Sequence, residues 1–338
     1  MIYVHVPFCR SRCRYCDFYS NVCSGDSPLM ETYISGLLAE AESRSEEIAA
    51  TKGVNTLYIG GGTPSLMPLH FFEKLLNTLP WRDFDEFTVE VNPDDILHRG
   101  REFADALKSL GVNRISMGVQ SLDDGLLKWM GRRHDAAGAR DAFRLLREAG
   151  FDNISLDVIF GIGGQSMEML SETLDGILEL GPEHISAYQL SIESGSALAK
   201  DVEAGRWTEL SEDDCAGQYA LICNKLRDAG YVHYEISNWA RRGFESRHNS
   251  AYWSRSPYVG LGPGAHSLRI GKEQIRSWNS PSLGGWTSES EILTPQQFRE
   301  EEIMLGLRTA KGCEIDGKKM IIPEDKWFVS DDIIASLF

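Results

Sequence analysis

Three cysteines near the N-terminus have the spacing that is typical of a metal centre with an open coordination position. Cys9, Cys13 and Cys16 form the pattern Cys-x3-Cys-x2-Cys. Three thiolates hold three irons of a cubane cluster, and the fourth iron is then left open for a substrate. A structural zinc site would add a second Cys or His pair at close range, and a bacterial ferredoxin would use Cys-x2-Cys-x2-Cys. The remaining alternative is three ordinary cysteines in a loop, which the polar neighbouring residues disfavour.

Short apolar runs alternate with longer amphipathic stretches along most of the chain, as they do in parallel β/α units. We expect strands at residues 3–8, 55–60, 87–91, 114–118, 153–160 and 184–191. Helices are expected at residues 28–50, 69–79, 94–110, 123–130, 135–149 and 166–180, with a linking segment at 195–206. Right-handed connections would place the six strands side by side in a curved sheet.

Glycines follow the second expected strand directly. Gly60, Gly61 and Gly62 lead into Thr63 and Pro64, and glycines at a strand end let the backbone approach a ligand closely. A phosphate-binding loop would need Gly-Lys-Ser/Thr, which does not follow here, so exposed backbone carbonyls suit an ammonium group instead. An ordinary tight turn is the alternative for this glycine run.

Four polar side chains stand in or just after the next strands. Glu90 lies inside an apolar strand, where an unpaired carboxylate is expensive to bury, and a structural ion pair is the alternative to a ligand role. Gln120 ends the following strand, Arg132 comes twelve residues later, and Asp157 lies in another apolar run. Amide, guanidinium and carboxylate groups at strand ends can bind the ribose and the carboxylate of a nucleoside ligand.

The opening Tyr-x-His-x-Pro-Phe-Cys-x3-Cys-x2-Cys resembles the N-terminal motif of radical S-adenosylmethionine (SAM) enzymes. Within them it resembles the branch that holds oxygen-independent coproporphyrinogen III oxidase and the haem chaperone HemW, over residues 1–310. The resemblance implies an α/β fold: a partial (β/α)6 TIM-like barrel at residues 1–195 and a smaller α+β accessory domain at residues 196–338. It also implies that an electron from a [4Fe–4S] cluster cleaves SAM to a 5′-deoxyadenosyl radical, chemistry that the cofactors carry.

The resemblance assigns ligands to individual residues. Cys9, Cys13 and Cys16 would hold the [4Fe–4S] cluster. The residues that would contact SAM are Tyr3, Gly61, Gly62, Thr63, Glu90, Gln120, Arg132 and Asp157. The glycine-rich stretch would bind the amino group of SAM, and for Tyr3 packing as a strand aromatic is the alternative.

Two departures separate the chain from the oxidase branch. That branch carries a fourth cysteine as Cys-x-Cys and a sizeable segment before the first strand, whereas here Phe18 takes the equivalent position and the motif begins at residue 9. The stretch from His248 to Trp253 matches the His-Asn-x-x-Tyr-Trp motif of the haem-chaperone branch. His248 would contact haem iron, since imidazole is a common axial ligand, or it would be a buried histidine that holds the two domains together.

The expected function is therefore that of a haem chaperone, which binds haem as cargo and delivers it to acceptors such as respiratory cytochromes. The alternative is an oxidoreductase that oxidatively decarboxylates coproporphyrinogen III, so enzymatic activity is left open. No second catalytic constellation, such as a Ser/His/Asp arrangement or His-Glu-x-x-His, is evident in the sequence. No catalytic residue is assigned for this reason.

Composition and charge restrict the partners. The 34 Lys and Arg residues against 50 Asp and Glu residues give a net charge of −16, and such a field repels nucleic acid phosphates. The odd number of cysteines, 7, fits a reducing compartment rather than a disulfide framework. No apolar run approaches the ~18 residues of a membrane span, so we expect a cytoplasmic protein, with peripheral membrane attachment left open.

Three arginines interleave with the cysteines in this acidic chain. Arg10, Arg12 and Arg14 would attract an acidic electron donor such as a flavodoxin or ferredoxin. The alternative is a solvated loop whose positive charge offsets the thiolates and the cluster. Both interpretations are compatible with the sequence.

Overall fold

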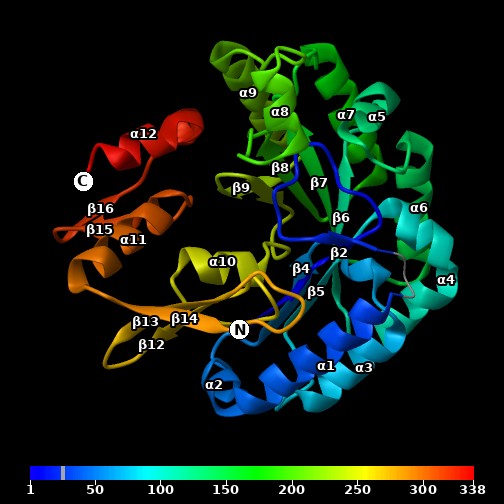
Figure 1. The fold of residues 1–338 in the computed structure, drawn as a ribbon. Coiled ribbons are helices and arrows are strands. Elements are labelled where there is room, and N and C mark those ends of the chain that lie inside the picture. The colour runs from blue at the N-terminus through cyan, green and yellow to red at the C-terminus, as the bar shows by residue number, and fades with distance from the viewer. Residues whose placement is uncertain (24–26) are drawn as a thin grey trace.

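A computed structural model describes residues 1–23 and 27–338 and is dominated by one nine-stranded sheet (Figure 1). Six of its strands run parallel and lie side by side in chain order. They are β1 (Ile2–Val6), β4 (Thr56–Gly61), β5 (Glu86–Val91), β6 (Arg114–Gln120), β7 (Ile154–Phe160) and β8 (His184–Gln189). The predicted α/β class with six parallel barrel strands is confirmed.

Three further strands extend this sheet at its two edges. β11 (Val259–Leu261) pairs in parallel with β1, and β10 (Asn238–Ala240) pairs antiparallel with β8 and then with β9 (Val232–Glu235). All three come from the second half of the chain. The sheet therefore crosses the boundary that the sequence suggests between 1–195 and 196–338, and that division stays a prediction.

Helices cover the outer face of the parallel strands, as Figure 1 shows. They are α1 (Pro28–Ser43), α3 (Leu69–Thr78), α4 (Pro93–Ser109), α6 (Ala136–Glu148) and α7 (Met167–Leu180), while α5 (Asp124–Met130) packs with Ile159 and Ile162 at the carboxyl end of β7. Side chains of Ser27, Asp123, Asp135 and Ser166 accept hydrogen bonds from the first turns of four of them, which fixes where those helices begin.

The predicted helix at 28–50 is two helices, because the chain leaves helical geometry at Arg44 (φ −103°, ψ 16°) before α2 (Ser45–Ala50). The Arg44 guanidinium bonds to Glu40 and Glu47 on either side of the break, and to the Gly260 carbonyl at 2.8 Å. A contact 216 residues away thus supports the break. The helical pattern of residues 28–50 gives no sign of this distant contact, so the break could not be predicted from it.

Side chains alternate strictly between the two faces of the parallel sheet. The outward positions are apolar and pack in one core with the helices: Val4, Ile59, Val89, Met117, Leu156 and Ile185 are examples. The inward positions are mostly polar: Tyr58, Glu86, Glu90, Arg114, Ser116, Ser155, Asp157, His184 and Ser186. Hydrophobic burial therefore forms the barrel wall, while the interior is left for polar chemistry.

The remainder of the chain mixes helices and strands beside the barrel. It contains α8 (Ala197–Glu203), α9 (Glu212–Asp228), α10 (Arg247–Trp253), β12 (His266–Ile270), β13 (Gln274–Asn279), β14 (Ser288–Leu293), α11 (Pro295–Leu307), β15 (Cys313–Ile315), β16 (Lys318–Met320), η2 (Glu324–Val329) and α12 (Ser330–Ala335). The predicted link at 195–206 contains the short helix α8, which the Ser196 side chain caps. Among the described residues, no helix combines the length and apolar character that a membrane crossing requires.

Helix α10 closes the end of the barrel at which the parallel strands begin. Glu86, at the start of β5, is buried and accepts hydrogen bonds from the backbone N–H groups of Arg247 and His248 at 2.8 and 2.9 Å. The Ser246 hydroxyl donates to the same carboxylate at 3.3 Å. The carboxylate thereby satisfies donors at the N-terminus of α10 and fixes the helix to the sheet.

Candidate functional site

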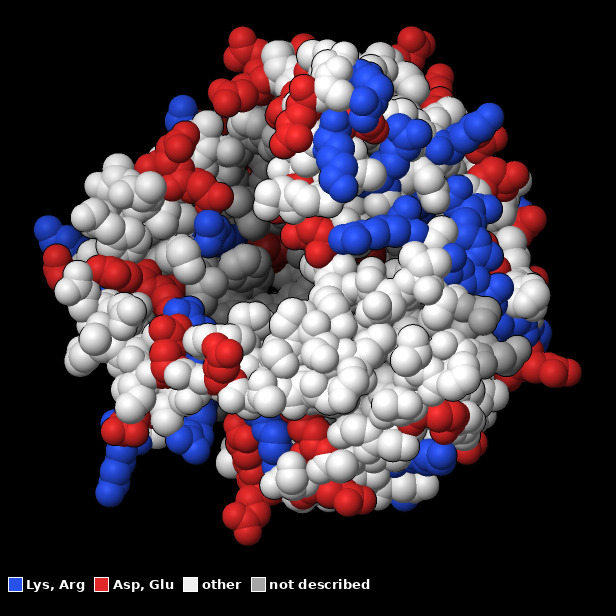
Figure 2. Space-filling view, viewed as in Figure 1, with Lys and Arg blue, Asp and Glu red and all other residues white. Residues whose placement is uncertain are grey.

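The carboxyl ends of the parallel strands open into a cavity of about 580 Å³, a volume that is typical of small-molecule sites. Figure 2 shows the same face of the molecule hollowed near its centre, between the barrel and the C-terminal segments. The structure brings ten of the residues singled out from the sequence into the cavity wall. They are Cys9, Cys13, Cys16, Gly61, Gly62, Thr63, Glu90, Gln120, Arg132 and Asp157.

The cysteine loop is held at its base by short backbone pairing. After β1, the two-residue strand β2 (Phe8–Cys9) pairs in parallel with β3 (Asn21–Val22). The N–H of Cys23 donates to the carbonyl of Cys9 at 2.9 Å. His5, the histidine of the opening motif, bonds through Nε2 to the carbonyl of Tyr19 at 2.9 Å. The barrel strand and the far end of the loop are therefore joined directly.

A chain of hydrogen bonds links two of the three sulfurs across three strand ends. Thr63 donates to the Cys9 sulfur at 3.5 Å, and Asn92 Nδ2 donates to Thr63 at 3.1 Å. Arg132 donates to Asn92 Oδ1 at 2.7 Å and to the Cys13 sulfur at 3.6 Å. Hydrogen bonds to thiolate sulfurs tune the potential of a cluster that they hold. The residues after β4, β5 and β6 thus position the loop.

The donor set fits the [4Fe–4S] cluster that the sequence predicts. Burial raises the pKa of the Cys9 thiol, and it raises the pKa of Cys16 to about 11, with the neighbouring thiols adding to the effect. The metal-free thiols of Cys9 and Cys16 are therefore protonated at neutral pH, and binding iron must displace their protons. Three sulfur ligands within one loop, and no fourth cysteine lining the described cavity, suit a cluster with one open iron.

Glycines provide the space between the sulfurs and the strand ends. Gly61 has φ +108°, a region that side chains disfavour, and a Cβ there would lie 2.6 Å from the ring of His5. A Cβ on Gly62 would lie 2.6 Å from the Phe8 carbonyl and 3.0 Å from the Cys9 sulfur. The glycine run is therefore required for the strand end to pass beside the cysteine loop, and it is more than a tight turn.

Two carboxylates face the cavity from neighbouring parts of the barrel. Glu90 accepts hydrogen bonds from the Tyr58 hydroxyl at 2.7 Å and from the Gly61 N–H at 3.0 Å. Burial raises the pKa of Glu90 to about 7, and the nearby Asp157 charge acts in the same direction. Burial also raises the pKa of Asp157 to about 6, against hydrogen bonds from serine hydroxyls such as Ser116 at 3.2 Å. A cationic ligand in the cavity would stabilise the charged form of both carboxylates.

Gln120 has an unusual backbone conformation at the end of β6. Its φ of +68° is in the left-handed region, and the pairing with β7 shifts register between Gly118 and Gln120. A Cβ on Gly118 would lie 2.7 Å from the Gln120 amide nitrogen, so this glycine leaves room for the amide. Strained residues cluster at ligand sites, because the surrounding structure must hold them there. The observation supports the ligand role that the sequence predicts.

Several cavity residues were missed from the sequence. Tyr58, Arg114, Ser116, Ser186 and Tyr188 line the cavity. Arg114 is fully buried, and its Nε has no hydrogen-bond partner among the described residues. The signal was the alternation of polar and apolar residues within β4, β6 and β8, which places these side chains on the face opposite to the helices.

Tyr3 and His248 lie outside the residues that line the cavity. The Tyr3 hydroxyl is 3.1 Å from His5 Nδ1. The Tyr3 ring is 6.1 Å from the ring of Tyr58, so Tyr3 packs behind the residues that line the cavity. His248 is buried in α10, where Nδ1 lies 2.9 Å from the Thr56 hydroxyl and Nε2 lies 3.3 Å from that of Tyr252. Its neighbour Asn249 does line the cavity. The ligand roles of Tyr3 and His248 stay predictions.

Comparison with known proteins agrees with this geometry. The sequence model of the radical SAM superfamily matches residues 3–177. The heme chaperone HemW of Lactococcus lactis is 36% identical over 93% of this chain and 83% of its own length. HemW of Bacillus subtilis is 36% identical over 92% of this chain and 83% of its own length. Coproporphyrinogen III oxidase (HemN) from Escherichia coli has the same fold, with a TM-score of 0.75, 22% identity, and coverage of 91% of this chain and 75% of that one.

The fold and the site define a member of the radical SAM superfamily, which implies a [4Fe–4S] cluster and SAM as its cofactors. Within the superfamily, the chain belongs to the HemW family. Its own residues would supply three sulfur ligands, with hydrogen bonds to two of the sulfurs, and the cavity wall adds two half-buried carboxylates. The cofactors would supply electron transfer and the cleavage of SAM.

Replacing Cys9, Cys13 or Cys16 with Ala should abolish the stable binding of iron and sulfide, because each removal leaves a second iron without a protein ligand. Iron and sulfide content and the visible absorbance after anaerobic reconstitution measure this. Cys23→Ala is the matched control, since Cys23 lies next to Cys9 but does not line the cavity. A cluster retained in any of the three variants, or lost in the control, would contradict the assignment.

The affinity for SAM should fall as the pH is lowered through about 7, because Glu90 loses its negative charge there while SAM carries a sulfonium and an ammonium group. Glu90→Gln should weaken binding at pH 8 roughly tenfold and flatten this dependence. Equilibrium dialysis of the cluster-loaded protein across the pH range measures it. The titration of SAM itself is common to both proteins. Asp157→Asn should keep the pH dependence but move it to lower pH, because the Asp157 charge helps to raise the pKa of Glu90. An unchanged profile in Glu90→Gln would exclude the role.

Proposed function

We propose that this protein is a haem chaperone that binds haem as cargo, together with a [4Fe–4S] cluster and SAM, and delivers it to acceptor proteins. The observation that carries the proposal is the similarity to curated heme chaperone HemW proteins. That similarity reaches 36% identity and extends over more than nine tenths of the chain, so it includes the C-terminal part. The likeness to the oxidase from Escherichia coli, at 22% identity, concerns the fold alone.

The cysteine loop supports this choice over the oxidase alternative. The position that holds a fourth cysteine in the oxidase branch is Phe18, which lines the cavity and has 62% of its surface exposed. Val22, in the same loop region, is 60% exposed. Large apolar side chains in water are informative where they gather beside a cavity, because they offer a flat surface to an apolar macrocycle. We infer that haem approaches the protein beside the cysteine loop.

His248 is the second candidate for contact with haem. As it lies, neither ring nitrogen is free, since each has a hydroxyl within hydrogen-bond distance. Burial lowers the pKa of His248 to about 3, so the ring is neutral, as an iron ligand must be. Coordination would require α10 to open and the Tyr252 contact to break. A role for His248 in haem binding therefore includes a local conformational change.

The experiment is a side-by-side assay of anaerobically reconstituted protein for haem binding and for coproporphyrinogen III consumption. We expect a haem absorption band that saturates at a defined stoichiometry, transfer of the haem to an apo-cytochrome, and no protoporphyrinogen. His248→Ala should shift the haem spectrum if the ring ligates iron, whereas Thr56→Val, which removes only a hydrogen-bond partner, should leave it unchanged. Conversion of coproporphyrinogen that depends on Cys9, Cys13 and Cys16 would establish the oxidase instead.

We also propose that an acidic flavodoxin or ferredoxin delivers the electron beside the cysteine loop. Figure 2 shows Lys and Arg gathered over the part of this face where the loop and helices α4 to α6 lie. Arg10 and Arg14 pair with carboxylates of the chain itself, Asp95 at 3.1 Å and Asp201 at 3.3 Å. Arg12 is exposed and takes part in no ion pair among the described residues. It is the arginine of this loop whose charge is most available to a partner.

Arg12→Glu should slow reduction of the cluster by a reduced flavodoxin several-fold at low ionic strength, because long-range attraction between charges steers the encounter. The difference from wild type should disappear at high salt, where the charges are screened. Stopped-flow absorbance of the cluster measures the rate. Lys272→Glu, an equal change of charge at an exposed position between β12 and β13, is the control. A rate that responds equally to both substitutions would argue against docking at the loop.

A further inference from the structure

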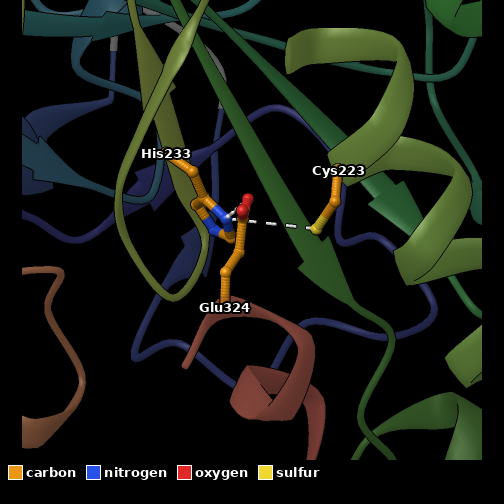
Figure 3. A group of neighbouring side chains, drawn as sticks. All are labelled: Cys223, His233 and Glu324. Carbon is orange, nitrogen blue, oxygen red and sulfur yellow. Dashed lines mark hydrogen bonds and ion pairs between the residues drawn. The ribbon is translucent and has the colours of Figure 1, made fainter. Parts of the chain in front are cut away.

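A second group of metal-ligating side chains lies outside the cavity. Cys223 of α9, His233 of β9 and Glu324 at the start of η2 come from three separate elements. Their ligand atoms all lie within 4.8 Å of one another. Figure 3 shows the three side chains pointing toward one another, with the Glu324 carboxylate beside the edge of the histidine ring that faces the thiol. The radical SAM site uses none of these residues.

The single ring proton of His233 cannot serve both of its acceptor neighbours. In one tautomer the bare Nδ1 faces the Glu324 carboxylate, with the Cys223 thiol at 4.0 Å as its donor, and in the other the bare Nε2 faces the Ile236 carbonyl. Nδ1 lies 2.9 Å from a Glu324 oxygen and 4.0 Å from the Cys223 sulfur. Nε2 lies 3.4 Å from the carbonyl of Ile236 and 3.5 Å from the Tyr219 hydroxyl, whose proton goes to that same carbonyl at 2.8 Å. A neutral imidazole has one proton for these two acceptor-rich sides. A cation at Nδ1 removes the conflict, with Nε2–H then donated to the carbonyl.

The ring of His233 is held rigidly. It stacks on Trp239 with ring centroids 4.0 Å apart, and Trp327 packs against it edge-on at 4.2 Å. Only 6% of the His233 side chain is exposed, and burial lowers its pKa to about 4, so the ring stays neutral and able to ligate a metal. A donated second N–H and a fixed ring are the supports that metal-binding histidines have in general. Glu324 is 38% exposed, which leaves a path for an ion and a water molecule.

We propose that Cys223, His233 and Glu324 form a zinc site, with water as the fourth ligand. One sulfur, one nitrogen and one oxygen donor suit a borderline-soft divalent ion with tetrahedral geometry. Bond lengths of about 2.0 Å to nitrogen and 2.3 Å to sulfur place these two atoms about 3.5 Å apart in a tetrahedron. The observed separation of 4.0 Å needs only a small adjustment. On binding, the Cys223 thiol loses its proton to solvent.

The site would fasten the C-terminal segment to the edge of the central sheet. Without an ion, Glu324 joins η2 to β9 by its contact with His233, and it pairs with Arg227 of α9 at 3.4 Å. Half-exposed contacts of this kind contribute little to stability. An ion coordinated by all three elements would bind the folded chain preferentially and would therefore stabilise it by mass action. This inference does not depend on haem or on SAM.

The test is the zinc content of the full chain after anaerobic loading of the iron–sulfur cluster, followed by replacement of the zinc with cobalt. We expect one equivalent of zinc beside the cluster iron. The zinc-free protein should then take up one equivalent of cobalt, with a thiolate-to-cobalt charge-transfer band and the visible bands of tetrahedral cobalt. The cluster also absorbs visible light, so the spectra are recorded on a chain that carries Cys9→Ala, Cys13→Ala and Cys16→Ala. Metal analysis is done on this triple variant and on the unsubstituted chain.

Cys223→Ser should lose the zinc equivalent and the charge-transfer band, and Glu324→Gln should weaken zinc binding while keeping the band. Cys215→Ser, at another buried cysteine of the same helix, should change neither. The proposal is overturned if the cluster-loaded full chain holds no zinc, or if Cys223→Ser keeps the charge-transfer band. In that case the three residues form only a structural hydrogen bond between η2 and β9.

Discussion

The desolvation of charged groups inside the barrel is the constraint on which the rest of the structure depends. Glu90, Asp157 and Arg114 lie on the inner face of the parallel strands, where burial raises the pKa of both carboxylates. Such groups are costly to keep without partners. The apolar outer face of the same strands offsets this cost, because it packs in one core with helices α1 to α4, α6 and α7. The interior is therefore stable enough to hold groups whose partner is a ligand.

The same strands also determine where the cysteine loop lies. Thr63, Asn92 and Arg132 follow β4, β5 and β6, and their hydrogen bonds reach two of the three sulfurs. A displacement of one strand end would therefore be transmitted to the ligands of the cluster. Gly61 and Glu90, the predicted SAM contacts, are joined to this network through the turn after β4. One connected set of residues would therefore position both the cluster and SAM.

Much of this was predictable from sequence because it is encoded locally. The strands appear as apolar runs, and Glu90 and Asp157 stand out within two of them as charged residues, which the structure places in the cavity wall. Arg114 and Ser116 were missed, because they stand at the edge of a run or are too small to attract notice. The break at Arg44 and the edge strand β11 depend on contacts with distant residues. The group at Cys223, His233 and Glu324 likewise unites residues up to 101 positions apart, from three elements, which no local pattern records.

The position of His248 gives the tryptophan-containing motif a structural role, whatever its part in haem binding. Glu86 and Glu90 lie on the same face of β5, four residues apart, so α10 is about 13 Å from the level of Glu90 along the strand. Tyr58 spans part of this distance: its ring lies 5.0 Å from that of His248, and its hydroxyl donates to Glu90. Loss of the His248 ring would therefore loosen Tyr58, which donates its hydrogen bond to Glu90, the predicted contact of SAM. A haem defect in a His248 variant identifies an iron ligand only when SAM affinity is unchanged in the same protein.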